Sequence, residues 1–136
     1  MWFNVWFVIW PAQQMVMASA ARVKEGGQAI PEAAARGARG GAASRTNTLL
    51  SIPMLFFMGA ASHWAFFTPT ARTAKVTMLI VFLIFLAIVE GNVVVGPATP
   101  DKASAGKKLL STVKGTLWAG FVLTAVLVIL LKLIFG

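Results

Sequence analysis

The sequence predicts an all-α integral membrane protein, a single domain over residues 1–136 with four transmembrane helices, or three if the first apolar segment lies in the interface. Hydrophobic residues make up 58% of the 136 residues and charged residues 12%, whereas a soluble domain has about 45–50% apolar and about 25% charged residues. The apolar residues also fall into long runs separated by basic segments. Such a chain cannot cover itself with polar groups, so lipid is its expected solvent.

The two clearest spans are expected at 109–135 and 76–96. Lys114 and Lys132 bracket 17 uncharged residues, which form a helix of about 26 Å. Because lysine side chains can extend to both interfaces, this helix crosses a hydrocarbon core of about 30 Å. The run at 76–96 is far longer than a strand of about 4–8 residues, and Pro97 ends it.

A third helix is expected at 48–67. Thr46 or Asn47 is a suitable N-cap residue. Pro53 then falls in the first turns of the helix, where its missing amide hydrogen costs less than in the middle.

The first apolar segment, 2–23, is long enough to span, and spanning is the preferred interpretation. Polar residues such as Asn4 lower its hydropathy, however, and Pro11 should kink it, so a helix lying flat in the interface is the alternative. A basic, Ala/Gly-rich loop is expected at 24–47. Within it a short helix should begin near Pro31 and fray at the Gly40-Gly41 pair.

The distribution of basic residues predicts the orientation. Placing the first and third loops inside puts nine basic residues in the cytoplasm and three outside, as the positive-inside rule prefers. The nine are Arg22, Lys24, Arg36, Arg39, Arg45, Lys102, Lys107, Lys108 and Lys114. A bacterial inner membrane is the expected location, and a four-span bundle would have both termini outside.

Some of these basic residues are expected to contact lipid headgroups or to set the topology: Arg36, Arg39, Arg45, Lys107 and Lys108. A net charge of +8 on a soluble protein would suggest nucleic acid. Here the charges lie between apolar runs, so nucleic acid is not an expected partner.

Two ionisable residues lie inside predicted spans. His63, the single histidine, can ligate a haem or pigment shared with a partner. The favoured alternative is a neutral imidazole bonded to a neighbouring helix or a lipid headgroup. Glu90, with Asn92 two residues on, should lie about 9 Å from the inner surface and His63 about 22 Å, so the two cannot bond.

Glu90 is expected instead to pair with a basic residue of the inner flank, namely Lys107, Lys108 or Arg45, or with a partner subunit. Small residues at Gly59, Ala60, Gly115, Ala119 and Gly120 are expected to pack helices closely. Without cysteine the chain cannot form iron–sulfur, zinc–thiolate or covalent c-type haem sites. No metal site and no cofactor within the chain alone is expected.

Three stretches carry a family resemblance. They are Asn4-Val5-Trp6 through Ile9-Trp10-Pro11 with Gln13, Ser44-Arg45-Thr46-Asn47-Thr48 leading to Ser51-Ile52-Pro53-Met54, and Glu90-Gly91-Asn92. Together they resemble the later part of the membrane domain of the cytochrome-linked urate oxidases (urate hydroxylases). That family joins a multi-helix membrane region to a C-terminal c-type cytochrome and is associated with urate oxidation.

The resemblance implies shared ancestry and helix packing over most of this chain. The chain departs from the family in lacking the preceding helices, their histidines and a Cys-x-x-Cys-His haem motif. A redox enzyme needs its redox centre, so urate oxidation is not expected of this chain by itself.

The expected function is that of a non-catalytic accessory subunit in a larger energy-converting membrane complex, respiratory or photosynthetic, where it serves packing and assembly. Its expected partners are that complex and lipids. The alternative is a redox membrane module related to urate oxidation, with haem ligated by His63 and a partner. A small transporter is disfavoured because Glu90 is a lone buried charge and the sequence has no internal repeat.

Overall fold

The computed structural model describes residues 1–63, 72–95 and 105–135, and all regular elements in these ranges are helices. They are η1 (Asn4–Ile9), α1 (Trp10–Lys24), α2 (Ala33–His63), α3 (Arg72–Val94), α4 (Ala105–Leu109) and α5 (Val113–Phe135). The predicted all-α class is confirmed. In the described ranges α3 and α5 are long and apolar enough to cross a membrane, whereas an arrangement of four transmembrane helices is not confirmed.

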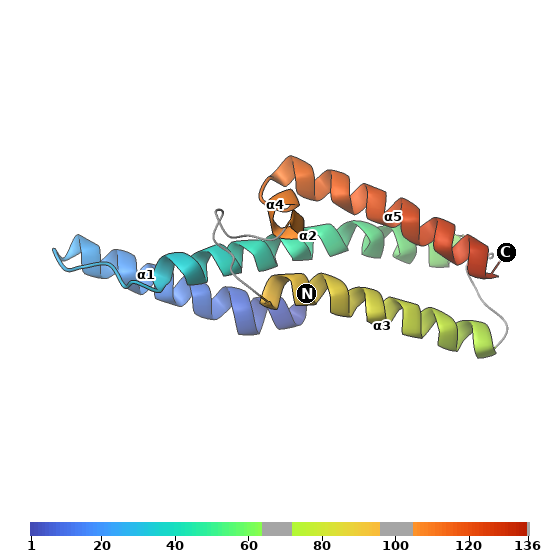
Figure 1. Cartoon of the computed structure of the whole chain (residues 1–136), viewed down its shortest axis with the longest axis horizontal. Coiled ribbons are helices and arrows are strands. Elements are labelled where there is room, and N and C mark those ends of the chain that lie inside the picture. Colours follow the sequence, from blue (N-terminus) through green and yellow to red (C-terminus); the bar gives the residue numbers. More distant parts are fainter. Residues whose placement is uncertain (64–71, 96–104, 136) are drawn as a thin grey trace.

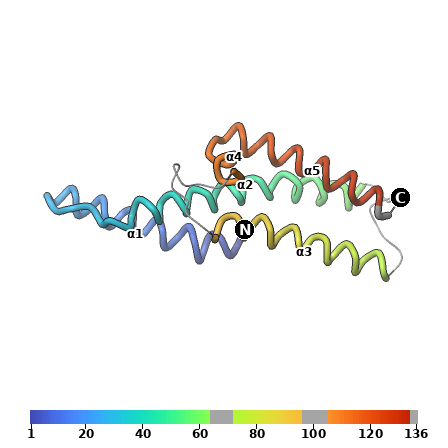
Figure 2. Tube along the Cα trace, viewed as in Figure 1, coloured from blue at the N-terminus to red at the C-terminus, as the bar shows by residue number. Residues whose placement is uncertain are grey.

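Helix α2 is the axis of the molecule. Its 31 residues correspond to about 46 Å, and it contacts η1, α1, α3 and α5. In Figures 1 and 2, η1 and α1 lie along its first half, and α3 and α5 lie along its second half. The chain is therefore elongated along α2.

The structure differs from the expected loop at 24–47, because α2 begins at Ala33 and continues through Gly40-Gly41. Gly40 is buried against α1: a Cβ atom there would lie 3.0 Å from the Cβ of Ala12 and 3.8 Å from the Cα of Ile9. Close packing between small residues stabilises this glycine-containing helix, which its low intrinsic propensity alone would not.

Because α2 begins early, Thr46, Asn47 and Pro53 lie in its middle and not at its start. Thr46 is fully buried, so it is no N-cap. Pro53 is buried inside the helix, where its ring removes the backbone hydrogen bond to the carbonyl of Leu49.

A hairpin joins α1 to α2. The backbone N–H of Ile30 donates to the hydroxyl of Ser19 across 3.0 Å, and Gly26 adopts a φ of 83° in the turn. At the other end of α1, Pro11 occupies the first turn, immediately after the π-helical η1. The proline thus marks a change of helix type.

Helix α5 packs on the second half of α2 through one stripe of its surface. Thr116, Gly120, Thr124 and Leu127 recur at helical spacing and are all buried, and Gly120 lies against the side chain of Ile52. The two threonine hydroxyls donate to backbone carbonyls four residues earlier, at 2.9 Å from Thr116 to Thr112 and 2.8 Å from Thr124 to Gly120. Their polar atoms are therefore satisfied within an apolar contact.

The other predicted packing residues are distributed differently. Ala60 is buried, but Gly59 is exposed, and a Cβ atom there would meet nothing within 4 Å. Gly115 and Ala119 are partly exposed beside the buried stripe. Within the chain, Ala60 and Gly120 are thus buried at helix contacts, and Gly59 faces outward.

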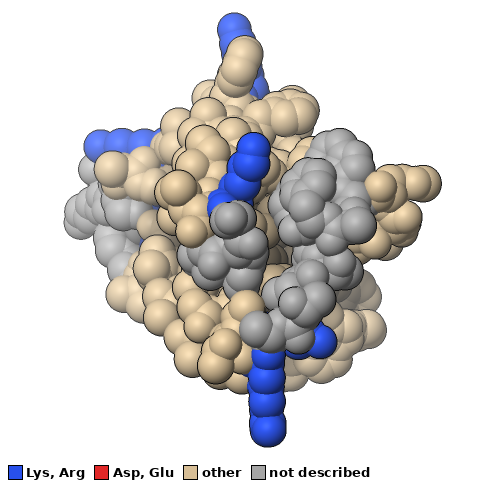
Figure 3. All heavy atoms as spheres, turned by 90° about the vertical axis from the view of Figure 1, so that its right-hand side faces the viewer, with Lys and Arg blue, Asp and Glu red and all other residues tan. Residues whose placement is uncertain are grey.

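Helix α3 is the least covered of the long helices, with Val93 its only buried residue in the described range. Figure 3 looks onto the end of the molecule that faces right in Figure 1. Its surface there is mostly tan, with scattered blue basic side chains and no red acidic one on the visible face. Uncharged side chains thus dominate the described part of this face.

Candidate functional site

Three polar residues from three elements meet at the middle of the molecule. The amide Nδ2 of Asn4, in η1, donates to Asn47 Oδ1 in α2 at 3.0 Å and to Glu90 Oε1 in α3 at 3.1 Å. Asn4 is completely buried. We call Asn4, Asn47 and Glu90 the polar cluster.

The polar cluster contains more acceptors than donors. Asn4 Oδ1 and Glu90 Oε2 are buried without a hydrogen-bond partner in the described structure, as is the nearby Thr46 hydroxyl. The amide of Asn47 makes only a long contact, 3.5 Å, with the carbonyl of Met1. A buried acceptor without a donor costs about 1–3 kcal/mol, so the cluster is suited to receiving a hydrogen-bond donor.

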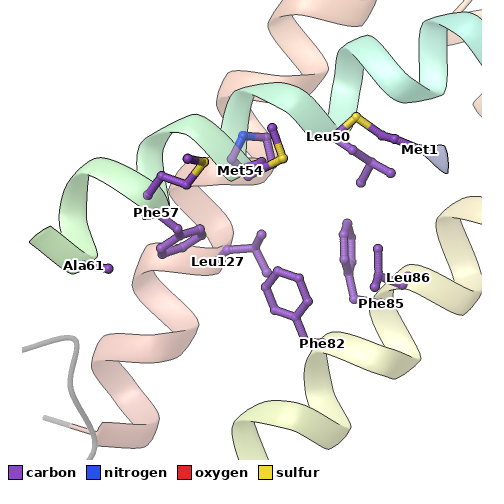
Figure 4. Close-up of a pocket in the computed structure, with 11 residues that line it drawn as sticks. Met1, Leu50, Met54, Phe57, Ala61, Phe82, Phe85, Leu86 and Leu127 are labelled. Carbon is purple, nitrogen blue, oxygen red and sulfur yellow. The ribbon is translucent and has the colours of Figure 1, made fainter.

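An apolar groove runs between α2 and α3, with α5 beneath it (Figure 4). Its volume is about 480 Å³. Helix α2 contributes Leu50, Pro53, Met54, Phe57, Met58 and Ala61, α3 contributes Phe82, Phe85 and Leu86, and α5 contributes Leu127. Aliphatic, thioether and aromatic groups therefore form nearly all of its wall.

One end of the apolar groove adjoins the polar cluster. Leu86 precedes Glu90 by four residues on α3, and Asn47 precedes Leu50 by three residues on α2, so each pair lies on one helix face. Met1 lines the groove, and its amino group lies 3.9 Å from Glu90 Oε1. The polar cluster thus lies next to one end of the groove, and Met1 contacts both.

Two of the predicted partners of Glu90, Arg45 and Lys107, bond to other groups. Arg45 Nη1 donates to the backbone carbonyls of Leu110, at 3.3 Å, and of Ser111. Lys107 Nζ donates to the carbonyl of Val95 at 2.6 Å. The structure therefore joins Glu90 to Asn4, and the basic residues tie α4 and the start of α5 to their neighbours.

Lys107, which was expected to contact lipid headgroups, is buried, with only 6% of its surface exposed. Burial, together with the positive charge of Arg39, lowers the pKa of Lys107 below its usual 10.5. Arg36 and Lys108 are exposed, and Arg39 and Arg45 are half-buried. Of the residues predicted to contact headgroups, Arg36 and Lys108 are thus exposed, and the other three are partly or fully buried within the chain.

His63 and Asn92 lie apart from the polar cluster. His63 is the exposed last residue of α2, about 24 Å along the helix from Asn47. The side chain of Asn92 lies so close to Gly106 that a Cβ atom on the glycine would be 2.9 Å from Asn92 Nδ2. Asn92 therefore packs against α4.

In the described ranges no group of three or more His, Cys, Asp or Glu side chains could hold a metal ion.

Sequence reasoning missed the roles of Asn4 and Asn47, which appeared as a polar interruption and an N-cap. A signal was nevertheless present, because each member of the polar cluster belongs to a different one of the three stretches that carried the family resemblance. The fold brings these three stretches to one point.

Comparison with known proteins agrees with that resemblance. The family model described as urate oxidase N-terminal matches residues 1–129, which include the polar cluster and the apolar groove. No curated protein and no solved structure matches the chain.

Proposed function

This chain belongs to the urate oxidase N-terminal family, and from that premise we propose that it is an accessory membrane subunit of a larger energy-converting complex. Its role there is to pack against partner helices and to support assembly. The chain itself carries out no reaction in this role, and any haem or pigment lies at an interface with a partner.

The observation that carries this proposal is the exposed apolar surface of α3. Its exposed side chains include Leu79, Ile80, Leu83, Ile84 and Ile88. Exposed apolar area costs roughly 25 cal/mol per Å² in water, and large contiguous patches of this kind mark membrane or protein contacts. Lipid and neighbouring helices are the environments that suit this surface.

Of the arrangements open from the sequence, we favour three spans. The segments 45–63, 75–90 and 114–132 each begin and end near polar or charged residues and measure about 23–27 Å as helices, close to a core of about 30 Å. The hydrogen bond between Asn4 and Glu90 supports this choice, since it joins the start of η1 to the end of α3. In a parallel four-span bundle these two points would lie at opposite surfaces.

The segment formed by η1 and α1 then lies at the cytoplasmic interface of a bacterial inner membrane, together with the nine basic residues of the first and third loops. Exposed aromatic residues in this part of the chain, Trp2, Phe3, Trp6, Phe7 and Trp10, suit the interface, where aromatic side chains are enriched.

Affinity purification from native membranes in a mild detergent tests the proposal. An accessory subunit should co-purify with the same larger membrane proteins at constant stoichiometry, and an untagged strain serves as the control. Recovery of the chain as a solitary, stably folded monomer would contradict the proposal.

A second candidate function is a redox membrane module related to urate oxidation. The family match supports it, and the exposed position of His63 at the end of α2 would let it meet a partner's haem. The test is the reduced-minus-oxidised optical spectrum of the purified complex from His63→Ala, with the neighbouring Ser62→Ala as control. Haem bands that are identical in both variants and in the parent would end this candidate.

A further inference from the structure

We propose that the apolar groove and the polar cluster form a binding site for a neutral, single-tailed membrane amphiphile with a hydroxyl head, the chemistry of an isoprenoid quinol. The tail lies between α2 and α3, and the head donates hydrogen bonds at Asn4 and Glu90. This binding activity goes beyond the packing role, because it needs no partner protein.

The width of the groove selects the tail. Along α2 the groove extends from Leu50 to Ala61, about 17 Å as a helix. A volume of about 480 Å³ over that length gives a mean cross-section of about 30 Å², whereas a helix about 10 Å across needs about 80 Å². A single extended chain matches this narrow cross-section.

The polar end selects the head group. Asn4 Oδ1 and Glu90 Oε2 are acceptors without donors in the described structure, and a hydroxyl group supplies the missing hydrogen. A phosphate would bring further acceptors and more negative charge beside the Glu90 carboxylate. The Met1 amino group, 3.9 Å from Glu90 Oε1, carries one positive charge and balances only the carboxylate. A diacyl phospholipid therefore fits neither the width nor the polar end.

The wall of the groove suits a ring and an unsaturated chain. Phe57, Phe82 and Phe85 direct their rings into it, and Met54 lies among them (Figure 4). Aromatic rings favour offset or edge contacts with other π systems, and thioethers adapt to irregular apolar shapes.

Photo-crosslinking of the full chain in phosphatidylcholine nanodiscs tests this site. The probe is an azido-substituted benzoquinol with a decyl tail, and the labelled residues are mapped by mass spectrometry. Labelling should concentrate on the facing sides of α2 and α3 and should saturate. Excess unlabelled decyl-benzoquinol should displace it, and excess phosphatidylethanolamine should not.

Two variants separate the head from the tail. Glu90→Leu removes the acceptors, and Leu86→Trp fills the groove while leaving the polar cluster in place. Each should weaken saturable labelling by at least tenfold. The control Phe121→Trp, on the exposed face of α5, should change it by less than twofold.

Circular dichroism checks that each variant keeps its helix content. If Glu90→Leu does not fold, the labelling of Leu86→Trp alone tests the proposed site. Labelling spread over all exposed apolar faces, or unaffected by Leu86→Trp, would overturn the proposal. Equal displacement by phosphatidylethanolamine would overturn it too, since the groove would then hold an ordinary phospholipid tail.

Discussion

Among individual residues, Asn4 connects most of the molecule, because its single amide nitrogen bridges α2 and α3. Carboxamide groups are costly to bury, and in lipid they stabilise a fold only where they are hydrogen-bonded. The Asn4 side chain therefore helps to fix the position of η1, although in the sequence it is only a polar residue within an apolar run.

Replacing Asn4 should lower stability. Asn4→Leu leaves Asn47 Oδ1 and Glu90 Oε1 without their donor, at a cost of about 2–3 kcal/mol in the free energy of unfolding. Reversible unfolding in mixed detergent micelles measures this. Gln14→Leu, a change at an exposed position of α1, is the matched control and should differ from the parent by less than about 0.5 kcal/mol. Equal losses in both variants would contradict a structural role for Asn4.

Lys107 should make stability depend on alkaline pH. Its pKa is lowered in the folded chain, first by burial and then by Arg39. Between that lowered pKa and the unfolded value of 10.5 the unfolded chain binds more protons, so the free energy of unfolding rises with pH. Below this window Lys107 is charged in both states, and its burial keeps stability lower.

Thermal melts in detergent between pH 7.5 and 10.5 check this expectation. The rise should be absent from Lys107→Met and should persist in Lys108→Met, since Lys108 is an exposed neighbour on α4. A rise of the same size in both variants would show that other groups cause it.

Between elements, close packing of small residues joins α1 to α2. Gly40 and Ala12 are buried at this contact, and the backbone of η1 approaches Gly40 at Ile9. The buried surface consists of backbone and methyl groups, so the fit depends on the absence of larger side chains.

The paired glycines of α2 offer a direct test of this contact. Gly40→Leu should displace α1 and destabilise the chain by about 1–3 kcal/mol, as overpacking does. Gly41→Leu should be neutral or stabilise by up to about 1 kcal/mol, because Gly41 is exposed with open space around it and leucine favours helix. The same unfolding measurement applies to both. Similar losses for the two variants would rule out close packing at Gly40.

For the whole molecule, the start of η1 meets the end of α3 (Figure 1), and this placement supports the proposed three-span arrangement. Two helices that meet end to end cannot both cross the same layer side by side. The positive-inside count is unchanged by this, because the nine and the three basic residues stay on the same sides whether or not the first segment spans.

Cysteine labelling distinguishes three spans from four, and the chain has no native cysteine to interfere. With three spans, Trp2→Cys and Ser111→Cys should react with a membrane-impermeant maleimide from the cytoplasmic side, and Thr73→Cys only from the outside. All three positions are exposed. Reaction of Trp2→Cys from the outside, with Ser111→Cys reacting from within, would establish the four-span arrangement.

From the sequence alone, the helical class and the apolar segments that became α3 and α5 could be predicted, because length and composition decide whether a segment can satisfy its backbone and suit lipid. The short helix expected near Pro31 could be predicted, but its continuation through Gly40-Gly41 into α2 could not. Glycine has a low helix propensity, and only the packing of Gly40 against Ala12 compensates for it. The polar cluster also escaped prediction, because Asn4 and Glu90 are 86 residues apart and periodicity reports only neighbours on one element. The apolar groove likewise exists only where α2, α3 and α5 meet, because a cavity is a property of the space between elements and no single segment encodes it.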